Sequence, residues 1–148
     1  MTAVIIREAT PADVPALVPM CKQLGYETTA ESVKRQLRRI QSDPEGQVFI
    51  AEFEGRPVGW IHIQTRHTLH ATPYSDVTGL VVAEGYREKN IGAGLLAHAE
   101  RWAQGKGFSE MCLRSNIKRE RAHRFYQRLG YAMNKTSLNF RKPLVSQG

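Results

Sequence analysis

Two basic side chains and three small or turn-forming residues lie close together near the middle of the chain. They are Arg87, Lys89, Asn90, Gly92 and Gly94. Glycine allows a ligand to approach the backbone, and the first turn of a helix presents N–H groups without partners inside the helix. Because those groups and the positive helix end favour an anion, the segment predicts an anion-binding loop. The alternative interpretation is a solvated basic connection between a strand and a helix.

Sequence patterns narrow the kind of phosphate loop that this segment can be. It lacks the G-x-x-x-x-G-K-[S/T] pattern of a Walker-type nucleotide site. The residues from Gly92 to Ala97 match G-x-G-x-x-A, the dinucleotide fingerprint. That fingerprint should follow its strand directly, whereas here a long polar loop intervenes. A dinucleotide-binding protein is therefore the weaker enzyme alternative.

The same loop resembles the [R/Q]-x-x-G-x-[G/A] segment of the GCN5-related N-acetyltransferase (GNAT) family, which wraps the pyrophosphate of acetyl-CoA. The resemblance implies that the cofactor is held by Arg87, Glu88, Lys89, Asn90, Ile91, Gly92, Ala93 and Gly94. One residue departs from the pattern, because Asn90 stands where the family has its first glycine. Asparagine tolerates left-handed backbone angles better than most residues, so it can keep the shape of the loop.

A second motif lies downstream, where A-H-R-F-Y-Q-R-L-G-Y at 122–131 resembles the family's A-x-x-F-Y-x-x-x-G-[F/Y] segment. The resemblance implies that Tyr126 is the general acid toward the leaving thiolate, since a phenol holds its proton at neutral pH. The alternative is an aromatic core residue beside Phe125. Arg119 stands where many members have an asparagine that contacts the cofactor, and it is a candidate for the same role. It can equally be a solvated side chain.

The central strand of the family bends away from the next parallel strand, and the pantetheine arm of the cofactor lies in the gap. By resemblance, backbone groups of Leu80, Val81 and Val82 hold that arm and face the thioester carbonyl. Gly79 predicts a β-bulge in this strand, because glycine inside a strand often marks one. The alternative is that Gly79 only permits close packing.

The sequence does not identify the general base, but two carboxylates, Glu84 and Asp76, are the leading candidates. Glu84 lies just after the central strand and Asp76 just before it. Glu52 and His62 lie on neighbouring predicted strands and could act through water. Each of the four has a structural role as its alternative.

The acceptor is bound in the family by the loop between the first two helices and by the loop before the central strand. Here those loops supply the candidates Tyr26, Glu27 and Tyr74. Aromatic and acidic groups suit an amine, so we expect the primary amine of a small molecule or a peptide. The residues do not distinguish an antibiotic from a polyamine, an amino acid or a protein terminus.

Hydrophobic periodicity predicts the elements that position these residues. Strands are predicted at 3–7, 48–53, 58–64, 77–82, 111–114, 132–133 and 136–141, and helices at 10–24, 28–42, 91–104 and 119–129. A polar connection is predicted at 65–75. This order predicts an α/β fold with a mixed sheet and helices on both faces, similar to the GNAT fold over nearly the whole chain. We expect one N-acetyltransferase domain at 1–142 and a loose tail at 143–148.

The net charge of the chain indicates which classes of ligand it favours. A formal net charge of +7 over 148 residues favours a polyanionic ligand. Coenzyme A is one, and nucleic acid is the alternative, through a basic stripe of Lys118, Arg119, Arg121, Arg124 and Arg128. A basic helix face is usually only solvated, and no recognition-helix or zinc pattern accompanies this one.

Two isolated cysteines, Cys21 and Cys112, indicate buried thiols in a reducing cytoplasm rather than a disulfide framework. We see no signal peptide, no apolar run of membrane-spanning length and no Cys/His spacing for a metal site. The segment 136–141 is predicted as an exposed edge strand, and such edges often pair with another chain. Because members of the family frequently dimerise as well, we expect a homodimer.

Overall fold

The computed structural model describes residues 3–87, 89–115 and 118–145. The chain divides into two compact units, Met1–Arg114 and Ser115–Gly148. The first unit holds the sheet and the helices α1, α2 and α3, and the second holds the helix α4. No helix in the described part of the chain has the length and apolar character needed to cross a membrane.

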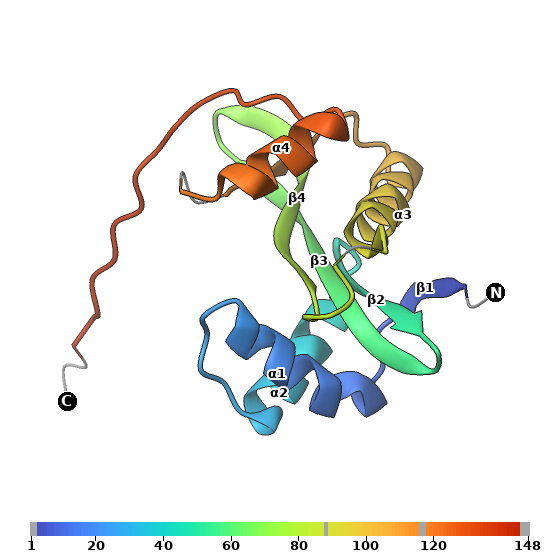
Figure 1. Cartoon of the computed structure of the whole chain (residues 1–148). Helices are drawn as coiled ribbons and strands as arrows, with labels where there is room; N and C mark the ends of the chain where they lie inside the picture. The colour runs from blue at the N-terminus through green and yellow to red at the C-terminus, as the bar shows by residue number, and fades with distance from the viewer. Residues whose placement is uncertain (1–2, 88, 116–117, 146–148) are drawn as a thin grey trace. The chain divides into compact units, whose positions relative to one another are not determined.

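The sheet of the first unit contains five strands in the order of the sequence. They are β1 (Val4–Glu8), β2 (Gly46–Phe53), β3 (Arg56–Thr68), β4 (Ala71–Val82) and β5 (Met111–Leu113). Figure 1 labels the first four. The first four pair antiparallel, and β5 pairs parallel with β4. A parallel neighbour needs a long crossover, which α3 supplies between β4 and β5. The predicted α/β class with a mixed sheet is confirmed.

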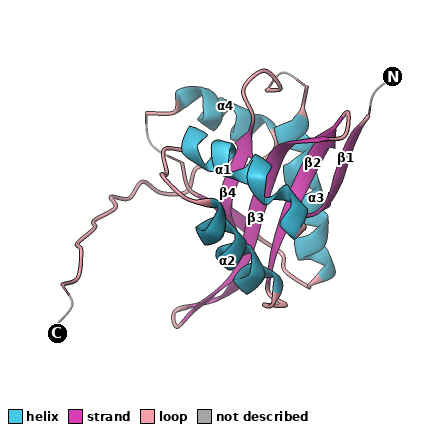
Figure 2. Ribbon diagram, turned by 90° about the horizontal axis from the view of Figure 1, so that it is seen from below, coloured by secondary structure: helices cyan, strands magenta, loops and turns pink. Residues whose placement is uncertain are grey.

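Helices cover both faces of this sheet (Figure 2). Helices α1 (Val14–Gln23) and α2 (Ala30–Gln41) pack on one face, over a core that includes Leu17, Met20, Leu37, Val48, Ile50 and Val81. Helix α3 (Ile91–Gly105) packs on the other, because its stripe Ile91, Leu95, Leu96, Ala99 and Ala103 is buried. A strand that is covered on both faces has a nearly continuous run of apolar residues in its sequence. The sequence therefore predicted β2 and the end of β4.

The polar connection predicted at 65–75 is wrong, because β3 and β4 continue through it as a hairpin that turns at Leu69–His70. Thr65 pairs with Ser75 across the ladder, and both side chains are buried. Polar residues in these strands hid the hydrophobic alternation on which the sequence prediction depended.

The closing strands predicted at 132–133 and 136–141 are also wrong, because residues 131–145 are described and none of them is in a strand. A strand needs a neighbour to accept and donate its backbone hydrogen bonds, and these residues have no ladder partner in the described part of the chain. Their large apolar side chains are exposed, including Met133, Leu138 and Phe140. The edge-strand argument for a homodimer therefore loses its basis.

Candidate active site

The site begins where β4 separates from β5. These strands pair only through Ser75 with Met111, Asp76 with Cys112 and Val77 with Leu113. Strand β4 continues to Val82, and within the described ranges no strand pairs with that stretch on the β5 side. The sheet is therefore open along the end of β4.

Alternation along the ladder decides which backbone groups of β4 face this opening. Ala83 N–H donates to the Val58 carbonyl on the β3 side at 2.8 Å. In an antiparallel pair, alternate residues turn their polar groups to the same side, so Val81 faces β3 while Leu80 and Val82 face away from it. Of the three backbone sites expected from sequence, two lie toward the opening.

A side chain from α1 fixes the end of this stretch. Gln23 Nε2 donates to the Val82 carbonyl at 2.9 Å, and Gln23 Oε1 accepts from Glu84 N–H at 3.2 Å. The N–H and carbonyl of Leu80 and the N–H of Val82 are left on the open side. An extended molecule with amide groups, such as pantetheine, can pair with them as a strand would. Sequence reasoning missed Gln23, since a glutamine at a helix end carries no distinguishing signal.

Strand β4 is irregular just before this stretch. His62 pairs with Gly79 but Ile63 pairs with Val77, so Thr78 is an extra residue in β4. The bulge predicted at Gly79 is confirmed. Close packing holds as well, because a Cβ on Gly79 would lie 2.8 Å from the Trp60 ring. The bulge increases the local bend of the strand, which favours its departure from β5.

The first turn of α3 provides a second set of open backbone groups. Asn90 precedes the helix with φ of 59° and ψ of 23°, and Gly94 N–H donates to its carbonyl at 3.1 Å. The expectation that Asn90 adopts the left-handed conformation is confirmed. Ile91, Gly92 and Ala93 come before that first helical bond, so their N–H groups are available to an anion such as pyrophosphate.

The remaining loop residues contribute unequally. Arg87 is exposed, whereas Lys89 holds its Nζ 4.8 Å from the centre of the Phe53 ring. A Cβ on Gly94 would lie 3.3 Å from Ile6 Cδ1, so Gly94 lets α3 pack closely on β1. Glu88, also predicted to bind the cofactor, lies outside the described residues.

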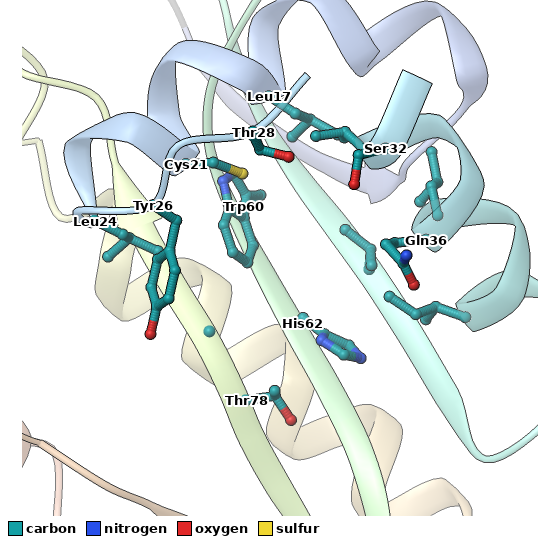
Figure 3. Close-up of a pocket in the computed structure, with 15 residues that line it drawn as sticks. Leu17, Cys21, Leu24, Tyr26, Thr28, Ser32, Gln36, Trp60, His62 and Thr78 are labelled. Carbon is teal, nitrogen blue, oxygen red and sulfur yellow. The ribbon is translucent and has the colours of Figure 1, made fainter. Parts of the chain in front are cut away.

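A pocket of about 380 Å³ lies between α1, α2 and the sheet (Figure 3). Its described lining is Leu17, Cys21, Leu24, Tyr26, Thr28, Ser32, Val33, Gln36, Leu37, Ile40, Val48, Trp60, His62, Thr78 and Gly79. Thr78 and Gly79 directly precede Leu80, whose backbone faces the opening in the sheet. The pocket and the open edge of β4 therefore meet at the bulge, so two reactants can be held against each other there.

The predicted acceptor residues differ in where they lie. Tyr26 lines the pocket, and the residue is 67% exposed. Glu27 is exposed and Tyr74 is half-buried opposite Arg66 in the β3–β4 ladder. Neither is among the described residues that line the pocket, so the structure brings only Tyr26 to it.

The carboxylates proposed as bases have other partners or positions. Asp76 is fully buried and accepts from Arg114 Nη1 at 2.5 Å and Nη2 at 3.0 Å. Burial opposes its ionisation, but the hydrogen bonds to Arg114 and Thr78 prevail and lower the pKa of Asp76. Glu84 is exposed, and Glu52 accepts from Arg7 Nε at 2.9 Å. The Asp76–Arg114 pair ties β5 to β4 at the point where the strands separate.

The Asp76 carboxylate should contribute strongly to stability. Asp76→Asn removes the buried anion that pairs with the half-exposed Arg114, and we expect a loss of about 1–2 kcal/mol in the free energy of unfolding at pH 7, because solvent screens the arginine. Because the folded-state pKa of Asp76 is lowered, this contribution is present above the unfolded pKa of about 3.9 and disappears as the pH falls through the folded value. Urea unfolding of both proteins at several pH values measures it. The control Asp43→Asn, at a half-buried position whose carboxylate accepts from Gln64 Nε2 rather than from an arginine, should change stability less, and equal losses in the two variants would contradict this role.

His62 differs from the carboxylates because it lines the pocket. Its Nε2 lies 3.3 Å from Gln64 Oε1. Burial lowers the pKa of His62, and the neighbouring Gln64 and Asp76 oppose that shift only in part. A neutral imidazole in the pocket can accept a proton at physiological pH. Sequence reasoning placed it on a neighbouring strand but could not place it in the pocket.

In the second unit, Tyr126 lies on α4 (Glu120–Arg128), and the exposed Arg119 precedes that helix. Tyr131 N–H donates to the Tyr126 carbonyl at 3.0 Å, and Gly130, with φ of 95°, donates to Gln127 at 3.1 Å. This is a Schellman motif, which needs glycine at the left-handed position. It also brings the Tyr131 ring within 6.2 Å of the Tyr126 ring.

The spacing of Tyr126, Gly130 and Tyr131 in the F-Y-x-x-x-G-Y motif therefore has a structural reason, because the turn at Gly130 places the Tyr131 ring against the Tyr126 ring. Burial raises the pKa of Tyr126, against a smaller opposing effect of Arg119. The phenol thus keeps its proton at neutral pH. The basic residues of the same helix, Arg121, Arg124 and Arg128, are exposed. No cluster of three metal-ligating side chains occurs among the residues that the structure describes.

Comparison with known proteins places this site in a family. The model of the acetyltransferase (GNAT) family matches residues 15–131. The aminoalkylphosphonate N-acetyltransferase of Salmonella typhimurium is 34% identical over 128 residues, which cover 85% of this chain and 83% of that protein. The aminoglycoside N(6')-acetyltransferase type 1 of Serratia marcescens is 25% identical over 119 residues, covering 77% and 82%.

Solved structures share the fold. An aminoglycoside N-acetyltransferase in complex with CoA superposes with a TM-score of 0.87 at 20% identity, covering 97% of both chains. A GNAT family acetyltransferase of Staphylococcus aureus superposes with a TM-score of 0.77 at 20% identity, covering 96% of this chain and 100% of that one. The motifs, the open β4 edge and the family match agree: the chain belongs to the acetyltransferase (GNAT) family and is an N-acetyltransferase.

Proposed function

We propose that the protein transfers the acetyl group of acetyl-CoA to the primary amine of a small molecule or a peptide by direct attack. One observation carries this proposal: the open edge of β4 and the pocket meet at Thr78–Gly79. A thioester lying along Leu80 would face an amine held in the pocket. The names of the relatives, which act on an aminoalkylphosphonate and on aminoglycosides, support an amine acceptor.

Acetyl-CoA is bound in this proposal by backbone groups more than by side chains. Leu80 and Val82 pair with the pantetheine arm, and the first N–H groups of α3 bind the pyrophosphate. The exposed guanidinium of Arg87 adds positive charge to that site. Glu88 and Lys89 complete the loop, and Arg119 is proposed to meet an acidic group of the cofactor. Tyr26 contacts the acceptor.

The transfer needs two proton movements. The amine nitrogen bonds to the thioester carbonyl carbon and loses a proton, which we assign to His62 rather than to Glu84 or Asp76, because His62 lines the pocket. A backbone N–H on the open edge of β4 stabilises the oxyanion. The carbon–sulfur bond then breaks, and Tyr126 gives its proton to the thiolate.

Cofactor binding tests this proposal before any acceptor is known. Acetyl-CoA should raise the melting temperature, because it binds the folded state, and NADH should not. Gly92→Val should weaken acetyl-CoA binding at least tenfold while the fold is retained, because it adds a branched side chain beside the pyrophosphate site. Isothermal titration calorimetry measures the dissociation constant.

A matched control lies at the other end of the same helix. Nothing lies within 4 Å of the Cβ position at Gly105, so Gly105→Val should leave acetyl-CoA affinity unchanged. Unchanged affinity in Gly92→Val would refute the pyrophosphate site. Stabilisation by NADH alone would favour the dinucleotide alternative, and salt-sensitive DNA retention without CoA binding would favour the nucleic-acid alternative.

We also propose a homodimer and a cytoplasmic location. Five large apolar side chains of the segment 131–145 are exposed, namely Met133, Leu138, Phe140, Leu144 and Val145. Burying them against a second copy would remove apolar surface from water. Neither cysteine forms a disulfide, as expected in a reducing compartment. Light scattering at micromolar concentration should give twice the chain mass of 16.7 kDa, and a monomer mass would exclude the dimer.

A further inference from the structure

We infer that the acceptor is a primary amine carried on an apolar chain or ring, without a second charged group. The inference rests on the proposed function, because it takes the pocket between α1, α2 and the sheet as the acceptor site. None of the described residues that line this pocket is Asp, Glu, Lys or Arg. That composition is unusual for this chain, in which 24% of residues are charged.

Apolar side chains form most of the pocket walls. Helix α1 contributes Leu17, and Leu24 follows directly after that helix. Helix α2 contributes Val33, Leu37 and Ile40, and the sheet contributes Val48 and Trp60. The absence of a side chain at Gly79 makes room for the Trp60 ring, which lies against the β4 backbone. These surfaces match a hydrocarbon chain or an aromatic ring.

The polar side chains of the pocket carry no carboxylate, ammonium or guanidinium group, and two of them lie where the amine is expected. In Figure 3, His62 and Thr78 lie together at the end of the pocket away from Leu17, beside the bulge in β4. Ser32 and Gln36 on α2 offer hydrogen bonds to an uncharged substituent. An amine at His62 would therefore extend its body over Trp60 toward Leu17.

The size of the pocket suits such a body. Its volume of about 380 Å³ has room for an arylalkylamine or a medium-chain alkylamine.

A second charge would be disfavoured in this pocket. A phosphonate or a second ammonium group would leave water without gaining an oppositely charged partner among the described lining residues. The same walls favour the neutral form of the attacking amine, which is the nucleophilic form. This acceptor class differs from those in the names of the two curated relatives.

Two matched pairs of acceptors test the inference. 2-Phenylethylamine and 2-aminoethylphosphonate share one aminoethyl arm, and hexylamine and 1,6-diaminohexane differ by one terminal ammonium group. With acetyl-CoA and a free-thiol readout, kcat/KM should be about 10²-fold higher for the first member of each pair. Equal values, or a preference for the charged members, would overturn the inference and leave the acetyltransferase proposal standing.

Measuring the binding of an amine beside Trp60 tests the pocket assignment independently of acetyl transfer. The chain has two tryptophans, so Trp102→Phe on α3 leaves Trp60 as the only one. 2-Phenylethylamine should change the fluorescence of Trp60 with saturation, and 2-aminoethylphosphonate should not at the same concentration. Binding without acetyl transfer would support the pocket and contradict the proposed function. Saturable binding of the phosphonate alone would reject the pocket assignment.

A charge placed on the pocket wall provides the matched variants. Gln36→Glu is nearly isosteric and should reduce the preference for hexylamine over 1,6-diaminohexane at least tenfold. Ala30→Glu adds the same charge to an exposed position of α2 that is not among the lining residues. It should leave the preference unchanged. Equal effects of the two variants would show that overall charge, rather than the pocket, selects the acceptor.

Discussion

Tyr126→Phe should lower kcat by roughly 10²–10⁴-fold, the range for losing one general acid. The variant keeps the ring, which packs 5.3 Å from the Phe125 ring and 6.2 Å from the Tyr131 ring. The melting temperature should therefore change little. Because the lost interaction forms only in the transition state, the dissociation constant of acetyl-CoA should also change little.

The size of the Tyr126 effect depends on how well water can replace the phenol. A loss smaller than the expected range would mean that water protonates part of the departing thiolate. The control Tyr131→Phe removes a hydroxyl from the neighbouring ring, and kcat should stay within a few-fold of wild type. Similar losses in both variants would point to the aromatic pair rather than to acid catalysis, and wild-type kcat in a stably folded Tyr126→Phe would remove Tyr126 from the mechanism.

His62→Gln should lower kcat by a similar factor of roughly 10²–10⁴, because glutamine cannot take the proton of the attacking amine. The pH dependence gives a second readout. Burial lowers the pKa of His62 below its ordinary value of about 6.5, so the neutral base is present at neutral pH and is lost as the pH falls through the lowered value. The acidic limb of kcat for wild type should lie below pH 6.5 and should be absent in the variant.

A histidine elsewhere on β3 controls for this substitution. His67 Nε2 lies 2.8 Å from Glu45 Oε2, and His67 is not among the described residues that line the pocket. His67→Gln should keep both kcat and the acidic limb. If His62→Gln retained the acidic limb with near-normal kcat, another group would be the base and the proton path through the pocket would be wrong.

The strongest inferences from sequence were those in which a local backbone requirement fixes the residue type. Asn90 adopts the left-handed conformation that opens α3, and Gly130 adopts the one that closes α4. Gly79 marks the bulge in β4. In each case a few neighbouring residues determine the geometry, so the pattern can be recognised without the rest of the fold.

The buried apolar stripe of α3 and the apolar run at the end of β4 were predictable for a related reason. Both follow the period of their own secondary structure, and burial of one stripe or of both faces leaves a signature in the sequence. The fold class then followed from the order of the elements. The wrong strand predictions concern segments whose conformation depends on a neighbouring strand. Pairs of polar residues extend β3 and β4 beyond their predicted ends, and the segment 136–141 has no ladder partner in the described chain.

The proton-transfer groups and the acceptor pocket depended on tertiary structure. From sequence, Asp76 was favoured over His62 as a candidate base. In the structure Arg114, which follows β5, pairs with Asp76, while His62 lies in the pocket between α1, α2 and the sheet. Gln23 fixes Val82 across 59 positions of sequence. The sequence by itself determined the family and most of the sheet, and it predicted the cofactor loop, because these follow local patterns. Only the tertiary structure distinguished the structural carboxylate from the candidate base, because long-range contacts set the charge and solvation of each side chain.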